Sequence, residues 1–275
     1  MKLSARIFGS LALLLVLGST IGCTKLRARD QLVKGVQAFK SGRYEEAVNH
    51  FQNSVQLDPS YDAAHLYLAT AYSYQVVPNL DSPDNLAIAR KALDGFDVVL
   101  AKEPNDLGAL RQEASIYRNI KQFDRAKQIE LKIIGIDPKD AEANYTIAVI
   151  DWTQAYKNAV TDLAANNPSM QDDGAGNVKK SKDTCSKLVA QNGDLVTEAL
   201  KYLQSAVDIN PTYSEAMDYL NLTYRRKADL ECGNDDARKA DLAQAEAWSS
   251  KSMGARKANE IAKEKKLSGG IDASK

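Results

Sequence analysis

The stretch GVQAFKSGRYEEAVNHFQNSVQLDP, residues 35–59, decides the fold class because it reads as one helical hairpin. Ala47 and Phe51 lie four residues apart, so they share one face of a helix. Gly42 permits the positive φ at which the first helix ends, and Pro59 cannot continue the second helix. Short helices are marginal in isolation, so this hairpin needs neighbours that cover its apolar sides.

The hairpin pattern recurs along the chain, each time closed by an Asp, Glu or Asn followed by proline, at Pro59, Pro104, Pro138 and Pro211. The successive prolines are 45, 34 and 73 residues apart. We interpret the unequal gaps as one hairpin with a short insertion and one with a long insertion. The residues in register with the first hairpin are Leu68, Ala69, Tyr72, Ala92 and Phe96 in the second unit, Tyr117, Phe123 and Ala126 in the third, Ala199 and Ala206 in the fourth, and Leu220 and Tyr224 in the fifth.

This arrangement resembles the tetratricopeptide (TPR) repeat, an antiparallel helix pair of about 34 residues. The residues that carry the resemblance are Gly35, Gly42, Tyr44, Ala47, Phe51 and Pro59. The resemblance implies an all-α, TPR-like α-solenoid of about five helix pairs, with insertions in the second and fourth and a long C-terminal capping helix. The expected pairs cover residues 28–61, 62–106, 107–140, 141–213 and 214–266, and residues 267–275 are expected to be a disordered tail.

Residues 1–22 have the composition of a secretory signal, with Lys2 and Arg6 before an apolar run over residues 7–17. The Gly22-Cys23 end resembles the bacterial lipobox, although Thr20 stands where leucine is usual. The resemblance implies acylation of Cys23, a lipidated tether over residues 23–27 that runs on to about residue 33, and sorting to the outer membrane, facing the periplasm. The alternative is an ordinary signal peptide with a chance cysteine.

The insertions and the end of the chain should have distinct structures. The segment over residues 76–84 reads as a loop, with Ser82 or Asp84 capping a helix from about residue 85 to 102. In the fourth pair we expect a helix from 141 to about 165, a polar mobile loop over 166–183, a short helix around 184–191 and a further helix from 194 to 209. Residues 235–266 read as one long helix with a polar outer face.

Two cysteines besides Cys23 lie in turns of adjacent repeats, Cys185 in the fourth pair and Cys232 in the fifth. Both turns are at the same edge of the expected solenoid. Because an exported protein meets an oxidising compartment, we predict a Cys185–Cys232 disulfide that pins the long insertion. The alternative is two unpaired thiols in a mobile segment.

Neither charge nor known motifs indicate catalysis. The whole chain has 36 basic and 36 acidic residues, and loss of residues 1–22 leaves a formal charge near −2, which argues against nucleic acid as a partner. No metalloprotease, phosphate-loop or nucleophile-elbow motif is present, and Asp172-Asp173-Gly174 lacks the ligand spacing of a calcium loop. We therefore expect no enzyme activity, no metal and no cofactor; the oligomeric state stays open.

What remains is a surface for protein partners. In TPR arrays the first helix of each pair lines the inner groove, which implies a scaffold role in envelope, secretion or pilus assembly. An alternative is a subunit for cell-wall glycan processing, which would need a carboxylate cluster, and Trp152 and Tyr156 could instead pack under the long insertion. The expected groove residues are Leu66, Thr70 and Tyr74, then Arg111, Ser115 and Arg118, then Tyr145, Val149, Trp152 and Tyr156, and finally Asp218, Leu222 and Arg225.

Overall fold

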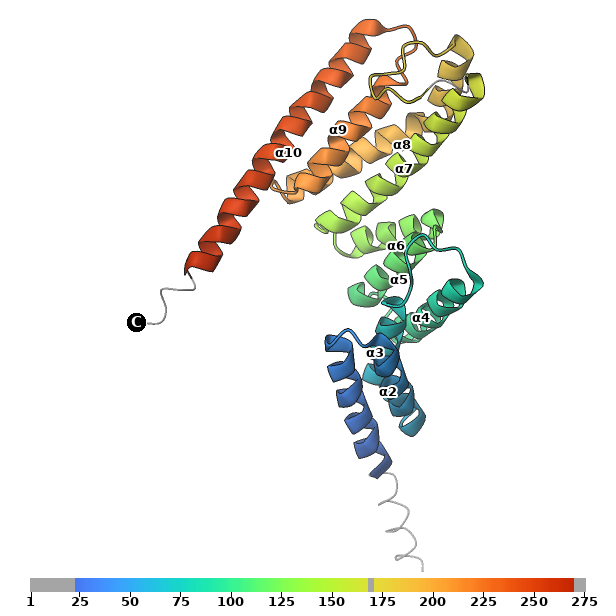
Figure 1. Ribbon diagram of the computed structural model, residues 1–275, viewed down its shortest axis with the longest axis vertical. Coiled ribbons are helices and arrows are strands. Elements are labelled where there is room, and N and C mark those ends of the chain that lie inside the picture. Colours follow the sequence, from blue (N-terminus) through green and yellow to red (C-terminus); the bar gives the residue numbers. More distant parts are fainter. Residues whose placement is uncertain (1–22, 168–170, 270–275) are drawn as a thin grey trace, which may run out of the picture. The chain divides into compact units, whose positions relative to one another are not determined.

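The computed structural model describes residues 23–167 and 171–269, and all regular elements in these two ranges are α-helices (Figure 1). Our interpretation of residues 1–22 as a signal therefore lies outside the described residues, as do residues 270–275 of the expected tail. After a first helix over residues 23–40, the helices are α2 (Tyr44–Leu57), α3 (Asp62–Ser73), α4 (Pro83–Lys102), α5 (Leu107–Asn119), α6 (Phe123–Ile136), α7 (Ala141–Asn166), α8 (Lys182–Ile209), α9 (Ser214–Ala228) and α10 (Asp235–Gly269).

The helix ends confirm the proline pattern. The second helix of each of the first four pairs ends two residues before its proline, at Leu57, Lys102, Ile136 and Ile209. Each proline is therefore just outside its helix, where its missing N–H and restricted φ stop further helical turns. The expected all-α succession of helix pairs, with insertions in the second and fourth, is confirmed.

The chain divides into two compact units, one that ends at Ile129 and one that starts at Glu130, so the boundary falls inside α6. In the first unit, alanines and two phenylalanines fill the space between helices, and Phe51 and Phe96 are fully buried. The helices approach closely at glycine: a Cβ at Gly35 would overlap the Phe51 ring, and one at Gly95 would lie 2.7 Å from the Ala69 Cβ.

The core of the second unit is formed where α7, α8, α9 and α10 pack in succession. Ala199, Leu203, Ala206 and Leu220 are fully or almost fully buried in it. Figure 1 shows α10 running alongside α9 and then continuing past it. The last buried residue of α10 is Ala255, so the described side chains that follow it on this helix are exposed.

The short insertion in the second pair is held by one buried amide. Ser82 caps α4 by accepting a hydrogen bond from the Asn85 backbone N–H at 3.2 Å, as expected for one of the two candidate caps. The Asn85 side chain donates to the carbonyls of Val77 and Leu80 at 3.0 and 2.7 Å and accepts from the Val77 N–H at 2.8 Å. The loop is thus tied to the first turn of the helix that follows it.

Three expectations about local structure were wrong. The segment expected as a tether is helical from residue 23, the first described residue. The expected short helix and the helix after it form one continuous helix, α8. Gly193 lies inside it, and a glycine in a helix lowers helix stability only modestly, so it does not end the helix. Finally, α10 extends to Gly269, so the first residues of the expected tail are helical.

Candidate functional site

In the first unit the expected inner face is formed by α3 and α5, which are in contact. Leu66 and Tyr74 of this face are exposed, and Tyr74 has 55% of its surface accessible. The Tyr74 ring nonetheless has fixed neighbours, because its centroid lies 4.9 Å from that of Phe39 and 5.3 Å from that of Tyr44. Edge-on and tilted contacts of this kind are favourable for aromatic pairs, so they hold the ring of Tyr74 in place although more than half of its surface is accessible.

Next to Tyr74 the surface is hollowed between α3 and α5, with a volume of about 380 Å³. The Ser73 hydroxyl bridges the two helices by a 3.1 Å hydrogen bond to the Gln112 side chain. Arg111 and Arg118 lie on α5, four residues before and three after the lining residue Ser115, hence along the same side of that helix; Arg111 is exposed and Arg118 half-buried. The residues that line this hollow are Ser73, Tyr74, Val76, Pro78, Gln112, Ser115, Ile116 and Asn119.

In the second unit, α7 and α9 bring together five aromatic rings. The Trp152 ring stacks on Tyr156 at 5.2 Å between centroids and meets Tyr219 edge-on at 5.3 Å. Tyr145 lies 5.5 Å from Tyr219 and 5.1 Å from Tyr213. Three of the five rings, those of Tyr145, Trp152 and Tyr156, come from the expected groove residues on α7. The structure therefore brings these three residues together.

The polar groups of this aromatic cluster differ in their surroundings. The Trp152 indole N–H is buried and has no hydrogen-bond partner among the residues that the structure describes, whereas the Tyr213 hydroxyl donates to the Glu142 carboxylate. Burial raises the pKa of Tyr219, and burial together with the bond to Glu142 raises that of Tyr213, so both phenols are neutral at neutral pH. Tyr156 is 41% exposed and is the member of the cluster most open to a partner.

Arg225 was expected to line an open groove, but its side chain is bonded within the second unit. Its guanidinium donates to the Gly174 carbonyl at 2.9 Å and to the Glu246 carboxylate, and its Nε donates to the Asn221 side chain at 2.8 Å. Asp218, another expected groove residue, accepts from Ser252 and Arg256 of α10. Both side chains are used within the unit, because here the insertion and α10 take up the positions that a simple repeat leaves free.

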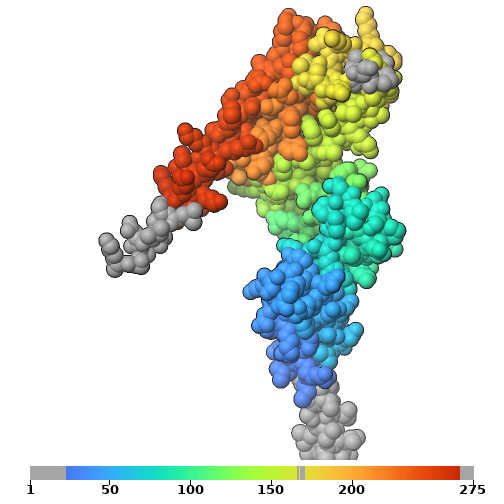
Figure 2. Space-filling model, in the orientation of Figure 1, coloured from blue at the N-terminus to red at the C-terminus, as the bar shows by residue number. Residues whose placement is uncertain are grey.

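A buried ionic network holds the long insertion, which was expected to be mobile. Arg226 Nη2 donates to both carboxylate oxygens of Asp172 at 2.7 Å, and its side chain is only 4% exposed. The Asn177 side chain donates to Asp172 at 3.1 Å and to Asp229 at 2.7 Å. Figure 2 shows the yellow atoms of the insertion packed against the orange atoms around the α9–α10 turn, where Arg238 donates to the Ala175 carbonyl at 2.9 Å. Residues 171–181 are therefore fixed to the body of the unit.

The two carboxylates of this network have opposite pKa shifts. Burial raises the pKa of Asp229 to about 6, because pairing with Arg226 and Asn177 offsets only part of the lost solvation. The Arg226 Nη1–Asp229 Oδ2 distance is 2.8 Å, yet neither atom meets hydrogen-bond geometry, so this contact is an imperfect ion pair. Burial also opposes ionisation of Asp172, but the hydrogen bond and charge of Arg226 outweigh it and hold the pKa of Asp172 below its ordinary value.

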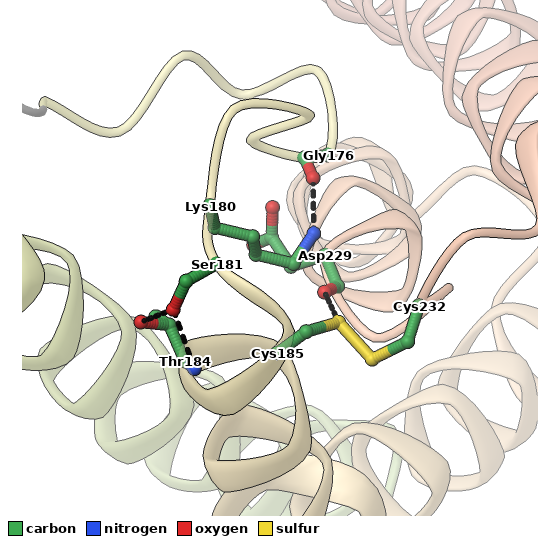
Figure 3. The surroundings of a disulfide bond; sticks show 7 residues. All are labelled: Gly176, Lys180, Ser181, Thr184, Cys185, Asp229 and Cys232. Carbon is green, nitrogen blue, oxygen red and sulfur yellow. Dashed lines mark hydrogen bonds between the residues drawn. A yellow bond between two sulfur atoms is a disulfide. The ribbon is translucent and has the colours of Figure 1, made fainter.

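Cys185 and Cys232 form a disulfide beside this network, with their Cα atoms 5.8 Å apart (Figure 3). Cys185 is buried at the start of α8 and its Sγ lies 3.7 Å from the Asp229 carbonyl oxygen, while Cys232 is exposed in the α9–α10 turn. Lys180 donates to the Gly176 carbonyl at 2.6 Å. The bridge thus links the first turn of α8, just after the insertion, to the turn that follows α9.

A cavity of about 380 Å³ opens beside the disulfide, and it was not among our expectations. Charged side chains of both signs line it, including Lys180, Asp235 and Arg238. Arg238 is committed to Asp235 at 3.0 Å and to the Ala175 carbonyl at 2.9 Å. These residues are far apart in sequence and follow no recognisable spacing, so only the paired cysteines could have pointed to this region.

Two further properties follow from the described residues. No group of three or more His, Cys, Asp or Glu side chains in residues 23–167 and 171–269 is arranged to hold a metal ion. Asp172 and Asp173, which resemble part of a calcium loop in sequence, instead accept hydrogen bonds from Arg226 and from the backbone N–H groups of Ala175 and Asn177. Of the helices that the structure describes, none has the length and apolar character needed to span a bilayer.

Comparison with known proteins agrees with this architecture. Residues 36–75 match the family model described as "TPR repeat". Sperm-associated antigen 1 of Rattus norvegicus is 26% identical over 137 residues, which are 50% of this chain and only 14% of that protein.

Solved structures show the same fold. MamA from residue 41 to its end, from Desulfovibrio magneticus RS-1, superposes with a TM-score of 0.54 at 16% identity, covering 84% of this chain and 96% of that one. YrrB, described as a TPR protein with an unusual peptide-binding site, has a TM-score of 0.51 at 14% identity, with 88% and 97% covered. The chain is therefore a helical repeat protein with a TPR-like α-solenoid fold and a TPR repeat over residues 36–75.

Proposed function

We propose that this chain is a non-enzymatic scaffold that binds protein partners on its inner helices and is held at a membrane by lipid on Cys23. The observation that carries the binding role is the exposure of Tyr74 and Tyr156, each supported by other rings. Partly exposed aromatic side chains that are held by their neighbours are typical anchors of protein interfaces, where a few such residues contribute most of the affinity.

The binding mechanism is capture of an extended or helical segment by a preformed surface. In the first unit, a partner side chain would enter the hollow between α3 and α5 and contact Tyr74, while the polar groups of Ser115 and Asn119 lie in its wall. In the second unit, Tyr156 offers a ring already stacked on Trp152. Because these side chains are held before the partner arrives, little conformational entropy is lost on binding.

The membrane anchor is inferred from residues 1–23 and from the position of Cys23, which is exposed at the start of the first described helix. Each CH₂ group of an attached acyl chain contributes about 0.8 kcal/mol to membrane binding, so two or more chains hold a protein stably. The Cys185–Cys232 disulfide supports an oxidising compartment. We place the protein on the periplasmic side of an outer membrane, in envelope, secretion or pilus assembly.

A photocrosslinking residue at Tyr74 or Tyr156, in the intact cell envelope, tests the binding face. Matched positions on second helices of the pairs are Arg90 of α4 and Lys201 of α8, both exposed. We expect discrete crosslinked partners at the two tyrosines and none of these partners at the controls. The same partners at all four positions, or at the controls alone, would contradict the inner-face assignment.

The anchor is tested separately by mass spectrometry of the N-terminal peptide. We expect a chain that begins at Cys23 and carries acyl groups, and we expect Cys23→Ala to release the protein from washed membranes. An unmodified Cys23 in membrane-bound protein would refute the anchor without affecting the binding face.

A further inference from the structure

The first described helix, residues 23–40, has an exposed surface that is strongly basic. The side of this helix that packs on the unit carries the buried apolar residues Ala28, Leu32 and Ala38. On the same side, the Ser54 hydroxyl of α2 donates a hydrogen bond to the Ala28 carbonyl at 2.7 Å. The exposed side carries five basic residues and one acidic residue, Asp30, which is already paired with Lys34 at 2.7 Å. The five basic residues are Lys25, Arg27, Arg29, Lys34 and Lys40.

This charge is a local property of the helix. The whole chain has equal numbers of basic and acidic residues, and the first turn of the neighbouring α2 is acidic, with Glu45 and Glu46. In the described part of the chain, no acidic side chain forms a direct ion pair with Lys25, Arg27 or Arg29; Lys25 and Arg29 act on Asp58 only at longer range. The positive face is therefore available to an anionic partner.

Two large apolar residues lie in the middle of the same exposed side. Leu26 is 69% exposed and Val33 is 54% exposed, and their separation of seven residues puts them on one line along the helix. At 3.6 residues per turn, Arg29 and Lys40 fall on one flank of this line and Arg27 and Lys34 on the other. An apolar line with basic flanks is the pattern of helices that lie in the interface of a membrane.

We propose that the exposed face of helix 23–40 lies on the anionic headgroups of a lipid leaflet, with Leu26 and Val33 in the interfacial layer. This inference rests on the proposed anchor, because lipid on Cys23 would keep the face within reach of the bilayer. Two apolar side chains are too few to hold a protein on a membrane alone. The face therefore orients the first unit on the surface, while the acyl chains provide the attachment.

The test uses the full-length lipidated protein, reconstituted in vesicles, with Val33→Cys labelled by the environment-sensitive fluorophore NBD. Val33 is exposed, so the label does not disturb the core, and Cys185 and Cys232 are protected in their disulfide. We expect blue-shifted emission in vesicles of phosphatidylglycerol and phosphatidylcholine, but not in phosphatidylcholine alone. High salt should reverse the shift without releasing the protein, because it screens the headgroup contact but not the acyl anchor.

Charge removal makes the test specific. Lys25→Gln, Arg27→Gln and Arg29→Gln together should lower the ratio of docked to undocked helix on the order of 100-fold, since each basic residue near an anionic surface contributes about fivefold. A matched control removes three exposed lysines from α10, with Lys257→Gln, Lys263→Gln and Lys266→Gln, and should leave the NBD emission unchanged.

Equal emission in the two kinds of vesicle would overturn the proposal, and so would equal loss in the two triple variants. If the first triple variant kept its emission shift but lost protein crosslinks, the basic face would belong to an acidic protein partner and the lipid proposal would be wrong. Failure of the anchor is a separate result: mass spectrometry would show Cys23 unmodified, and the NBD shift would then be measured on the unacylated full chain carrying Cys23→Ala, so that Val33→Cys is again the one thiol that the label meets, added to the same vesicles.

Discussion

The guanidinium of Arg226 holds both carboxylate oxygens of Asp172 at 2.7 Å across 54 residues of sequence. This contact fastens the long insertion to α9, and the same guanidinium lies 2.8 Å from Asp229. All three side chains are largely withdrawn from solvent, with 4%, 15% and 2% of their surfaces exposed. One buried arginine in the second unit therefore serves two carboxylates, one in the long insertion and one just after α9.

Replacing Arg226 with alanine should destabilise the second unit more than replacing Asp172. Arg226→Ala leaves Asp229 buried without its counter-ion, which costs about 3–5 kcal/mol. Asp172→Ala leaves Arg226 with Asp229 and should cost less. Urea unfolding followed by tryptophan fluorescence measures both, since the two tryptophans of the chain, Trp152 and Trp248, lie in this unit. Equal losses for the two variants would contradict the shared role of Arg226.

A control for this experiment comes from the first helix. Asp30→Ala removes an exposed pair with Lys34, and such i,i+4 pairs contribute about 0.3–0.5 kcal/mol. It should leave the fluorescence-detected transition of the second unit unchanged.

Reducing the Cys185–Cys232 disulfide should lower the free energy of unfolding of the second unit by about 4 kcal/mol. The bridge closes a loop of 47 residues, and a cross-link of that span restricts the unfolded chain by this amount in the chain-entropy model. The measurement is the urea midpoint with and without reductant. The double variant Cys185→Ala and Cys232→Ala should show no response to reductant. Thiol labelling of both cysteines in unreduced, unfolded protein would refute the bridge.

Gly176→Ala and Gly193→Ala should have opposite effects on stability. Gly176 has φ +92°, and a Cβ there would lie 2.7 Å from Arg238 Cδ and 3.0 Å from the Ala228 carbonyl oxygen. Gly193 lies inside α8, where a Cβ meets nothing within 4 Å. We expect a loss of about 1–3 kcal/mol at Gly176 from strain and a gain of about 0.5–1 kcal/mol at Gly193 from helix propensity. Differential scanning calorimetry gives both signs, and a stabilising Gly176→Ala would show that the insertion is not packed this closely.

The repeat architecture could be predicted because its determinants are local in the sequence. Proline after an acidic residue or asparagine disfavours further helical turns, and the second helices of the first four pairs all end two residues before such a proline. Small residues such as Ala47 and Ala92 were expected where helices approach, and both are fully buried. These signals act within a few residues, so they can be read without knowing which distant segments pack together.

The insertion could not be predicted because its contacts are not local. Its composition suggested a mobile loop, yet Asn177 is buried and bonds to Asp229, 52 residues away. Arg225 occupies an inner-face position by helical spacing, but its guanidinium is taken by the Gly174 carbonyl of the insertion. Helical spacing within a repeat predicts which face of the helix a side chain is on. It cannot reveal that an insertion, distant in sequence, already covers that face.

Asp229 should make the stability of the second unit depend on pH between about 4 and 6. Its pKa is about 6 in the folded protein against an ordinary value of 3.8, so the folded state binds this proton more tightly than the unfolded chain. Its contribution is therefore fully present below about pH 4 and is lost as the pH rises through 6, a change on the order of 3 kcal/mol.

The variant Asp229→Asn cannot titrate and isolates this effect. The free energy of unfolding of the wild type minus that of the variant should fall between about pH 4 and 6 and be level above that range. Asp172 has a lowered pKa and acts in the opposite sense, so its contribution is present above its ordinary pKa and is lost as the pH falls. A wild-type curve parallel to that of Asp229→Asn would show that folding leaves the pKa of Asp229 at its ordinary value.

Trp152 should tolerate phenylalanine but not alanine. The indole packs on Tyr156 and Tyr219, and such aromatic pairs contribute about 0.5–1.5 kcal/mol each beyond area burial. Its buried N–H has no hydrogen-bond partner within residues 23–167 and 171–269, so phenylalanine removes an uncompensated donor while keeping a ring in the stack. We expect Trp152→Ala to cost about 3 kcal/mol and Trp152→Phe about 1 kcal/mol or less. Trp248, which remains as the fluorescent probe in both variants, reports the unfolding.

The same two variants test how Trp152 supports binding at Tyr156. If crosslinking from Tyr156 survives in Trp152→Phe and is lost in Trp152→Ala under conditions where both are folded, the stacked ring is what presents Tyr156 to its partner. Loss of crosslinking in both variants would assign the contact to the indole itself.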